Sequence, residues 1–256
     1  GTMLVHHYDS GYKGSLPSSY ASGNKIENEQ GVAFHLHVET GKYITAELNG
    51  EMFRYPSPRY QTMVPSRGHR LDLSLQDPGN KVLQWKARVV NKTWQITPAD
   101  GTARLRPLND FSTTRFDGQV IYNYEDLFKW QSRLVISIYS QTQLKTPGYA
   151  AVQQLRLCSS RSLQMTAQFV LFSVSDWENR IYLYEPGFYY SFNFPCFYGS
   201  GQKTTILLTL RPFHQLTFST KISVIKYGSR DVIGSGADQI NGNKKWEAGL
   251  QLRLNL

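Results

Sequence analysis

The stretch from Thr204 to Tyr227 constrains the fold more than any other part of the sequence. Its two halves both alternate apolar and polar residues with a period of two, a pattern that predicts two amphipathic strands. Pro212 lies between the halves, and we expect it at the second position of the connecting turn, where its fixed φ fits and no N–H is needed. Each strand is about ten residues long, close to what a tilted strand needs to cross a bilayer. The stretch therefore predicts a long hairpin with a tight turn.

The same unit recurs along the chain. Pairs of alternating segments flank short turns, and longer polar or aromatic stretches separate the pairs. We expect the short turns at 40–42, 77–80, 125–126 and 159–161, the long loops at 9–31, 55–69, 91–111, 175–202 and 228–245, and a shorter loop near 145–148.

Together with end segments Leu4–Tyr8 and Trp246–Leu256, these pairs make about twelve antiparallel strands, an even number. A soluble sandwich has no reason to place its long connections at one end, whereas an outer-membrane barrel has short periplasmic turns and long extracellular loops. The sequence therefore predicts an all-β fold, an antiparallel transmembrane β-barrel formed by residues 1–256 as a single domain. Aromatic residues near the strand ends suit interfacial girdles: Tyr43, Trp85, Trp130, Tyr149 and Trp246.

The composition is compatible with such a barrel. The 256 residues contain no stretch approaching about 18 consecutive apolar residues, which excludes a transmembrane helix. A mean hydropathy of −0.41 does not argue for a soluble protein, because alternating barrel strands average to a polar value. The first residues, GTMLVHHYD, lack a basic region followed by an apolar core. We therefore expect an export signal for the Sec route to have been removed or to lie upstream, and N-terminal sequence to be missing.

Charge and cysteine content point to no particular ligand. The net charge is +9, but Lys and Arg are scattered, so the sequence does not support nucleic acid as a partner. Cys158 and Cys196 are too few for a disulfide framework or a metal site, and we expect them at opposite ends of the barrel and not bonded to each other. His35 and His37 share one face of a strand, yet no third ligand has a telling spacing, so we expect neither a metal nor another cofactor.

Charged residues on the polar side of the strands should face the lumen if the apolar sides meet lipid. They could line a weakly anion-preferring pore, or they could pair with one another and fill an interior that twelve strands keep narrow. The expected lumen-facing residues are Lys86, Arg88, Lys129, Arg133, Arg156, Lys221, Arg253, Glu47 and Glu51.

The loop at 175–202 is the longest and most aromatic. Gly187, Pro195 and Gly199 favour a structured hairpin over disorder. It could fold inward as a plug, extend strands above the membrane, or offer a docking surface whose aromatic side chains contact a saccharide or a protein. The residues expected to form this plug or docking loop are Tyr189, Tyr190, Phe192, Phe194, Phe197 and Tyr198.

Several short motifs carry a resemblance to a known family. They are NEQG at 28–31, FRYP at 53–56, YLYEPG at 182–187, FPCFYG at 194–199 and IGSGADQINGN at 233–243. With these motifs the chain resembles the C-terminal barrel region of a family of Bacteroidota outer-membrane proteins, some of which have a helix-hairpin-helix segment ahead of the barrel. The resemblance implies the fold and an outer-membrane location in a Gram-negative bacterium, but no settled activity. The helix-hairpin-helix segment is absent from this sequence, so the resemblance implies no DNA binding.

Three functions remain open at this point. The first, which we favour, is a non-enzymatic subunit of a larger cell-envelope assembly, in contact with outer-membrane lipid and other envelope proteins. The second is a stand-alone pore for small solutes or nucleic acid. The third is a barrel hydrolase, which needs a Ser or Asp paired with a His. Serines 10, 15, 18 and 19 lie between His6 and His35, but no third catalytic member stands out, so we expect no enzyme.

Overall fold

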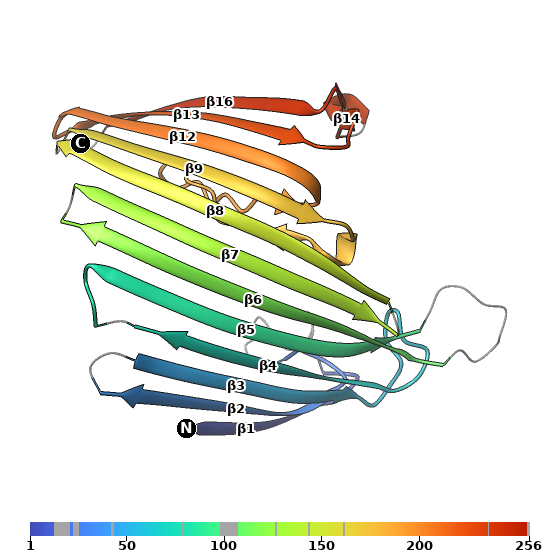
Figure 1. The fold of residues 1–256 in the computed structure, drawn as a ribbon. Coiled ribbons are helices and arrows are strands. Elements are labelled where there is room, and N and C mark those ends of the chain that lie inside the picture. The colour runs from blue at the N-terminus through green and yellow to red at the C-terminus, as the bar shows by residue number, and fades with distance from the viewer. Residues whose placement is uncertain are drawn as a thin grey trace. The chain divides into compact units, whose positions relative to one another are not determined.

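The computed structural model describes residues 1–12, 21–22, 26–41, 44–77, 79–97, 107–125, 127–142, 144–160, 162–234 and 236–254. Its main feature is an antiparallel sheet of 12 strands in the order β1-β2-β3-β4-β5-β6-β7-β8-β9-β12-β13-β16 (Figure 1). The predicted all-β class and the count of about twelve antiparallel strands are confirmed. β1 and β16 are the two edge strands of this order, and no ladder within the described residues joins them.

The strands of the sheet are long. Their bounds are β1 (Thr2–Tyr8), β2 (Glu29–Thr40), β3 (Ile44–Tyr55), β4 (Ser66–Gln76), β5 (Leu83–Ile96), β6 (Asn109–Tyr124), β7 (Phe128–Gln141), β8 (Leu144–Ser160), β9 (Leu163–Val174), β12 (Gly199–Phe213), β13 (Leu216–Tyr227) and β16 (Lys244–Leu254). Short elements occupy two of the connections: 3-10 helices η1 (Trp177–Asn179) and η2 (Gly236–Asp238), and strand pairs β10 (Ile181–Tyr182) with β11 (Cys196–Phe197) and β14 (Val232–Ile233) with β15 (Ile240–Asn241). No helix among the described residues is long and apolar enough to cross a membrane.

Short and long connections alternate along the chain, with one exception. The connection between β7 and β8 spans only residues 142–143, so the predicted loop near residues 145–148 is wrong. Pro147 and Gly148 instead belong to β8. The ladder between β8 and β9 ends at the pair Gly148–Val174, so Pro147 lies beyond it, and its missing N–H removes no hydrogen bond from that ladder.

The predicted long loops are shorter than expected because the strands continue past the apolar alternation. The loop at 175–202 is 175–198, and the loop at 55–69 is 56–65, since β4 already begins at Ser66. These strand ends have polar residues or glycine on both faces. The alternation of apolar and polar residues is therefore lost there, although the pairing with the neighbouring strand continues.

The hairpin of β12 and β13 is confirmed, but Pro212 is not in its turn. The turn is formed by residues 214–215, and Pro212 lies at an irregularity in the ladder between Leu210 and Phe213. A bulge of this kind leaves a strand position unpaired, which is where a strand tolerates proline.

The chain divides into two compact units. Unit 1 comprises residues 1–76, 87–116 and 138–145, and unit 2 comprises residues 77–86, 117–137 and 146–256. Unit 1 thus holds β1 to β4 with parts of β5, β6 and β7 and the first two residues of β8, and unit 2 holds the remaining parts of those strands with β9 to β16.

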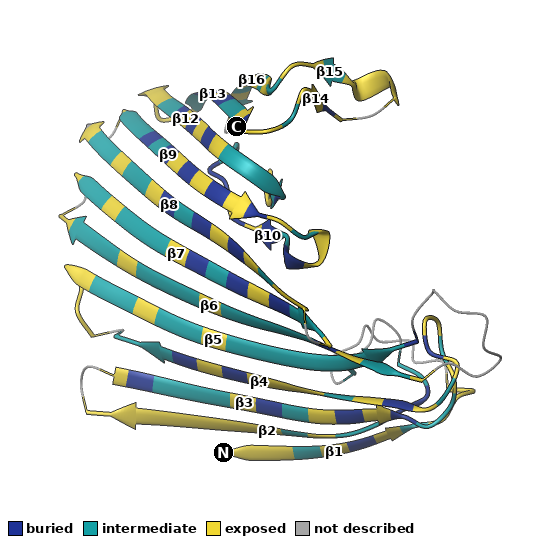
Figure 2. Cartoon of the chain, turned by 45° about the vertical axis from the view of Figure 1, so that its right-hand side comes forward, coloured by how far each residue is buried: buried dark blue, intermediate teal, exposed yellow. Residues whose placement is uncertain are grey.

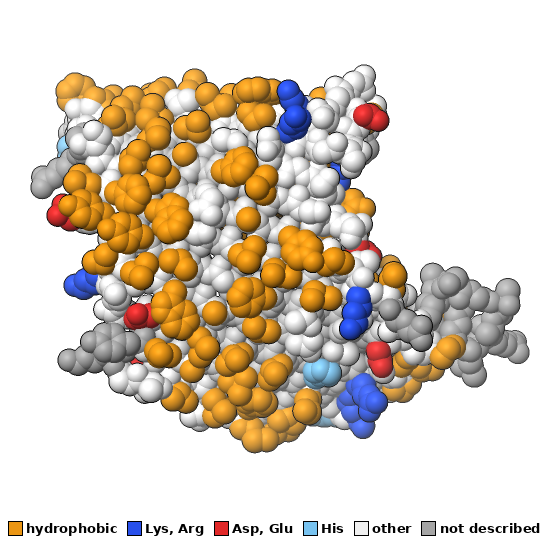
Figure 3. Space-filling view, in the orientation of Figure 1, with side chains coloured by type: hydrophobic (Ala, Val, Ile, Leu, Met, Phe, Trp, Pro, Cys, Tyr) orange, Lys and Arg blue, Asp and Glu red, His pale blue; other side chains and the backbone are white. Residues whose placement is uncertain are grey.

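Within each unit the strands have an apolar face and a polar face, and the burial of residues alternates along them (Figure 2). On the apolar face, large hydrophobic side chains are exposed, in unit 1 on β2 and in unit 2 on β9, β13 and β16 (Figure 3). Examples are Val32, Phe34, Leu36 and Val38 in unit 1, and Phe169, Leu171, Ile222, Trp246, Leu250, Leu252 and Leu254 in unit 2. The side chains that alternate with them form the polar face, which contains the charged residues predicted to face a lumen.

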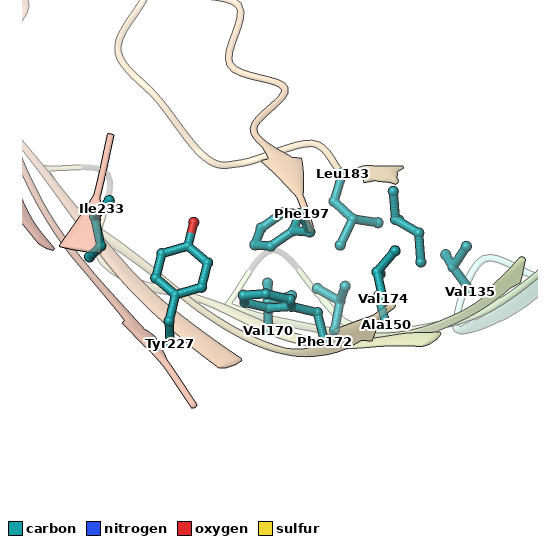
Figure 4. Packing of buried hydrophobic residues seen from close by; sticks show 11 residues of the cluster. Val135, Ala150, Val170, Phe172, Val174, Leu183, Phe197, Tyr227 and Ile233 are labelled. Atoms are coloured by element: carbon teal, nitrogen blue, oxygen red, sulfur yellow. The ribbon is translucent and has the colours of Figure 1, made fainter. Parts of the chain in front are cut away.

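The buried hydrophobic cluster of unit 2 lies on this second face, under the long connection between β9 and β12 (Figure 4). Val170, Phe172 and Val174 of β9 contact Leu183 and Phe197 of the connection. Phe172 and Phe197 have ring centroids 4.9 Å apart. At the end of β9 that precedes the long connection, the side chains on the polar face are therefore hydrophobic, and the connection packs on them.

Candidate functional site: the loop of residues 175–198

The connection between β9 and β12, hereafter the 175–198 loop, lies on the polar face of unit 2 and has a regular backbone structure of its own. It folds back on itself as an open hairpin, in which Leu183 N donates to Pro195 O at 3.4 Å and Glu185 N donates to Asn193 O at 3.0 Å. The β10–β11 pair continues the same hairpin. The predicted structured hairpin in this loop is confirmed.

Glu185 joins the loop to the strands. Its side chain is 2% exposed and lies 2.8 Å from Lys203 Nζ and 3.0 Å from Lys221 Nζ. Thr205 donates a hydrogen bond of 2.5 Å to the same carboxylate. Lys203 and Thr205 are on β12 and Lys221 is on β13, so a single loop residue binds two neighbouring strands.

The charge of Glu185 depends on these lysines. Burial by itself would raise the pKa of the Glu185 carboxyl, but the hydrogen bonds from Lys203 and Thr205 and the two ammonium charges hold that pKa below its usual value. The carboxylate is therefore ionised at neutral pH. Together, Glu185 and its two lysine partners carry a net positive charge at the centre of the site.

Asn179 holds the first part of the loop. The residue is fully buried, accepts a hydrogen bond of 2.7 Å from Ser137 Oγ of β7, and donates to the backbone carbonyl of Thr146 in β8. Gln168 of β9 adds a hydrogen bond of 3.0 Å to the carbonyl of Tyr184. β7, β8, β9, β12 and β13 of unit 2 thus all contribute polar groups that bind this connection.

The tip of the loop contacts β16 and exposes aromatic rings. The side-chain amide of Gln251 exchanges two hydrogen bonds of 3.0 Å with the backbone of Tyr189. Arg253 lies over the Tyr189 ring, 4.4 Å from its centroid. Tyr190 is 91% exposed and Phe192 is 85% exposed. The loop is therefore a structured segment with an anchored base and two exposed aromatic side chains at its tip.

Neither protein-family models nor curated proteins gave a match to this sequence.

The six aromatic residues predicted for a plug or docking loop separate into two groups. Phe197 is buried in the cluster under the loop, and Tyr198 packs against that cluster. Tyr189, Tyr190, Phe192 and Phe194 are exposed. The first group fixes the loop to the sheet, and the second is accessible to a partner.

The predicted lumen-facing charges mostly have partners. In unit 1, Arg88 binds both oxygens of Asp72 (Nε–Oδ1 2.8 Å, Nη2–Oδ2 2.5 Å), Glu47 lies 3.7 Å from His37, and Glu51 accepts a hydrogen bond from Ser22. In unit 2, Arg133 binds both oxygens of Asp117, Lys221 binds Glu185, and Arg253 stacks on Tyr189. Lys86 is exposed.

Lys129 and Arg156 belong to a different environment. With Arg211 they line a cavity of about 890 Å³ in unit 2, near the short turns. Among the described residues of this lining, Glu125 is the acidic one. Arg156 donates a hydrogen bond of 2.8 Å to Gln164. No described carboxylate lies within ion-pair distance of these three cations.

The other candidates from the sequence give no assembled site. His35 Nδ1 donates a hydrogen bond of 2.7 Å to Asn49 Oδ1. Within the described ranges no group of three metal-ligating residues is found. Cys158 and Cys196 are free. Residues 15, 18 and 19 and the expected girdle residue 43 lie outside the described residues, whereas Trp130, Tyr149 and Trp246 of the same predicted girdles are exposed.

Sequence reasoning missed Glu185, Lys203 and Asn179. Glu185 is the only acidic residue of the aromatic stretch 181–198, and a lone carboxylate among aromatic residues is a signal for a buried ion pair. Its partners could not be identified, because no local pattern shows which strands a long loop covers. Asn179 gave no signal at all.

Proposed function

We propose that this chain is an integral outer-membrane β-barrel protein, with its twelve strands in the bilayer, its short turns in the periplasm and its long loops outside. The carrying observation is the row of exposed aliphatic and aromatic side chains on the apolar face of each unit. A soluble protein rarely exposes so large a contiguous apolar surface, whereas lipid-facing strands require it. The strands of the sheet, apart from the shorter β1, are at least as long as the roughly 9–11 residues that a tilted membrane strand needs.

The proposal requires that the backbone of both edge strands be paired. Unpaired N–H and C=O groups in a hydrocarbon layer each cost several kcal/mol. β1 and β16 are the strands that would meet in a closed barrel, or would pair with strands of another chain. The resemblance to Bacteroidota outer-membrane proteins supports the same location.

Within this class, the role we propose is that of a non-enzymatic subunit of a cell-envelope assembly. The 175–198 loop packs on the polar face, which would be the lumen, and the charged residues of that face largely bind one another. Both features favour a filled interior over an open channel. The exposed Tyr190 and Phe192 offer a contact surface for an envelope protein, since aromatic side chains are enriched at protein interfaces.

A second candidate, a stand-alone pore for small solutes, is favoured by one specific observation. Lys129, Arg156 and Arg211 line a cavity at the short-turn end of the polar face without a carboxylate partner among the described residues. Basic side chains in such a position favour the entry of anions. This candidate predicts conductance in planar bilayers with a preference for anions, reduced in the Lys129→Gln variant and in the Arg211→Gln variant.

The experiment that tests the proposal is purification of the chain from its native membrane in a mild detergent, with mass analysis of everything that co-elutes. Retention in the membrane after carbonate washing and a stoichiometric partner protein would support both location and role. A chain that stays in the membrane but elutes alone, with single-channel conductance, would replace the assembly role by the pore. Release by carbonate without detergent would overturn the membrane location.

A further inference from the structure

Arg54 of β3 and Arg67 of β4 lie directly opposite each other in the ladder between these strands. Both side chains are exposed and lie on the apolar face, because they alternate with the buried Phe53, Tyr55 and Ser66. They occupy the next-to-last position of the ladder, before the long connection of residues 56–65. Figure 3 shows Lys or Arg side chains beside a histidine at the right-hand end of the lower strands, where the apolar surface ends.

Two like charges directly opposite each other destabilise a sheet. No described carboxylate lies within ion-pair distance of either arginine. The nearby carboxylate of Asp110 accepts a hydrogen bond of 2.9 Å from Gln95, which in turn accepts one from the backbone of Arg67. An arrangement that is unfavourable by itself becomes favourable when an anion binds between the two guanidinium groups.

The surface next to Arg54 is apolar, whereas the same-face neighbour of Arg67 on β4 is the exposed His69. One position further from the loop on the same face, Val5, Val32 and Met52 lie side by side in the ladders of β1, β2 and β3. Val5 and Met52 are each 69% exposed. These residues, together with Arg54 and Arg67, line one groove of about 910 Å³. The groove therefore has a cationic end and an apolar floor, which matches a molecule with an anionic head and a hydrocarbon chain.

Unit 2 has the same arrangement on its own apolar face. Lys226 of β13 lies directly opposite Lys244 of β16, again next to a long connection, and both are exposed. The neighbouring pair on that face toward the strand centre is Val224 and Trp246. Pairs of directly opposed cations thus occur at the loop end of the apolar face in both units, and Arg54–Arg67 is one of two such pairs.

We propose that Arg54 and Arg67 bind the phosphate of an anionic membrane lipid, whose acyl chain lies along Val5, Val32 and Met52. Guanidinium groups bind phosphate through two parallel hydrogen bonds, and a lysine cannot reproduce this geometry. This inference rests on the proposed membrane location, because the end of the apolar face is at the level of lipid headgroups only if that face meets the bilayer.

The test is native mass spectrometry of the detergent-solubilised full chain, titrated with phosphatidylglycerol or with zwitterionic phosphatidylcholine. The wild-type protein should retain phosphatidylglycerol in preference to phosphatidylcholine. The double variant Arg54→Gln/Arg67→Gln should lose this preference by about tenfold, and Arg54→Lys/Arg67→Lys should lose part of it. A charge-matched control, Lys86→Gln/Lys129→Gln, removes two cations from the polar face and should retain the lipid as the wild type does. Each variant is checked for an unchanged melting temperature.

The outcomes separate this inference from the proposed function. Equal loss of lipid in the control would mean a general charge effect and would overturn the site. Displacement of the lipid by inorganic phosphate at equal concentration would assign the arginines to a soluble anion and would also overturn it. A protein that resists carbonate extraction but shows no lipid preference would refute the lipid site alone, whereas extraction by carbonate would refute the membrane location itself.

Discussion

Glu185 lies 2.8 Å from Lys203 Nζ, and this ion pair connects the 175–198 loop to the first residues of the strand that follows it. The pair is almost completely buried, since the side chains are 2% and 9% exposed. Lys221 of the next strand lies on the other side of the same carboxylate. A loop that could have extended into solvent is thereby fixed on the polar face of unit 2.

Substitution of Glu185 by Gln should destabilise the protein. The change leaves two buried lysines without a counter-charge, and the loss of one partner of a buried ion pair typically costs about 3–5 kcal/mol. Protease cleavage within residues 186–194 should accelerate, and the denaturant midpoint of unfolding should fall. The control is Glu178→Gln, whose side chain is 51% exposed in the same loop and should change stability by less than about 0.5 kcal/mol. An equal effect of both substitutions would contradict the anchoring role of Glu185.

Acidification should release the loop through the same group. The pKa of Glu185 is lower in the folded protein than in the unfolded chain, so its contribution to stability is complete above the unfolded value, about 4.3, and is lost as the pH falls through the folded value. Hydrogen exchange of residues 181–197 should therefore be slow at pH 7 and accelerate below the usual range of a glutamate, after correction for the intrinsic rate. In Glu185→Gln this acid-dependent step should be absent. An unchanged step in that variant would assign it to another carboxylate.

The sequence predicted the strands whose centres alternate, because side chains of a strand project to opposite faces with a period of two. β12 and β13 were found on that basis, with Ile206 and Ile222 on one face and Thr205 and Ser223 on the other. The ends of the strands were missed for the same reason. β4 begins at Ser66, where Arg67 and Gly68 break the alternation although the ladder to β3 is already formed.

The candidate site was only partly predictable. The aromatic character of the loop is local and could be seen, but the pairing of Glu185 with Lys203 and Lys221 is set by where the loop folds, which the sequence does not encode locally. The same holds for Arg54 and Arg67, since their opposition depends on the register between β3 and β4. For Pro212 the local pattern predicted a turn, but the residue lies at a bulge within the strand.

Gly201 should not tolerate a side chain. It pairs with Phe172 on one side and Tyr227 on the other, and the two rings meet across it with centroids 5.8 Å apart. A Cβ at this position would collide with the backbone carbonyl of Lys226. Gly201→Ala should therefore lower the free energy of unfolding by about 1–3 kcal/mol, measured by denaturant unfolding. Gly11→Ala is the control, because a Cβ there meets nothing within 4 Å, and its stability should be unchanged.

A charge placed on the apolar face distinguishes a lipid-facing strand from a water-facing one. Leu250 of β16 is 70% exposed and lies near the middle of its strand. If that face meets lipid, Leu250→Arg should destabilise the protein by about 2–4 kcal/mol, the effect of an arginine near the bilayer midplane. If it meets water, the same exposed substitution should change stability by less than about 0.5 kcal/mol.

The matched control for Leu250→Arg is Val232→Arg, which replaces an exposed apolar residue in the connection of residues 228–243 and should be nearly neutral in either case. Reversible unfolding of both variants in lipid vesicles supplies the measurement. A large loss confined to Leu250→Arg would mean that the apolar face is in contact with hydrocarbon. Similar small changes in both variants would mean that this face is in water, and the outer-membrane proposal would then fail together with the lipid site of Arg54 and Arg67.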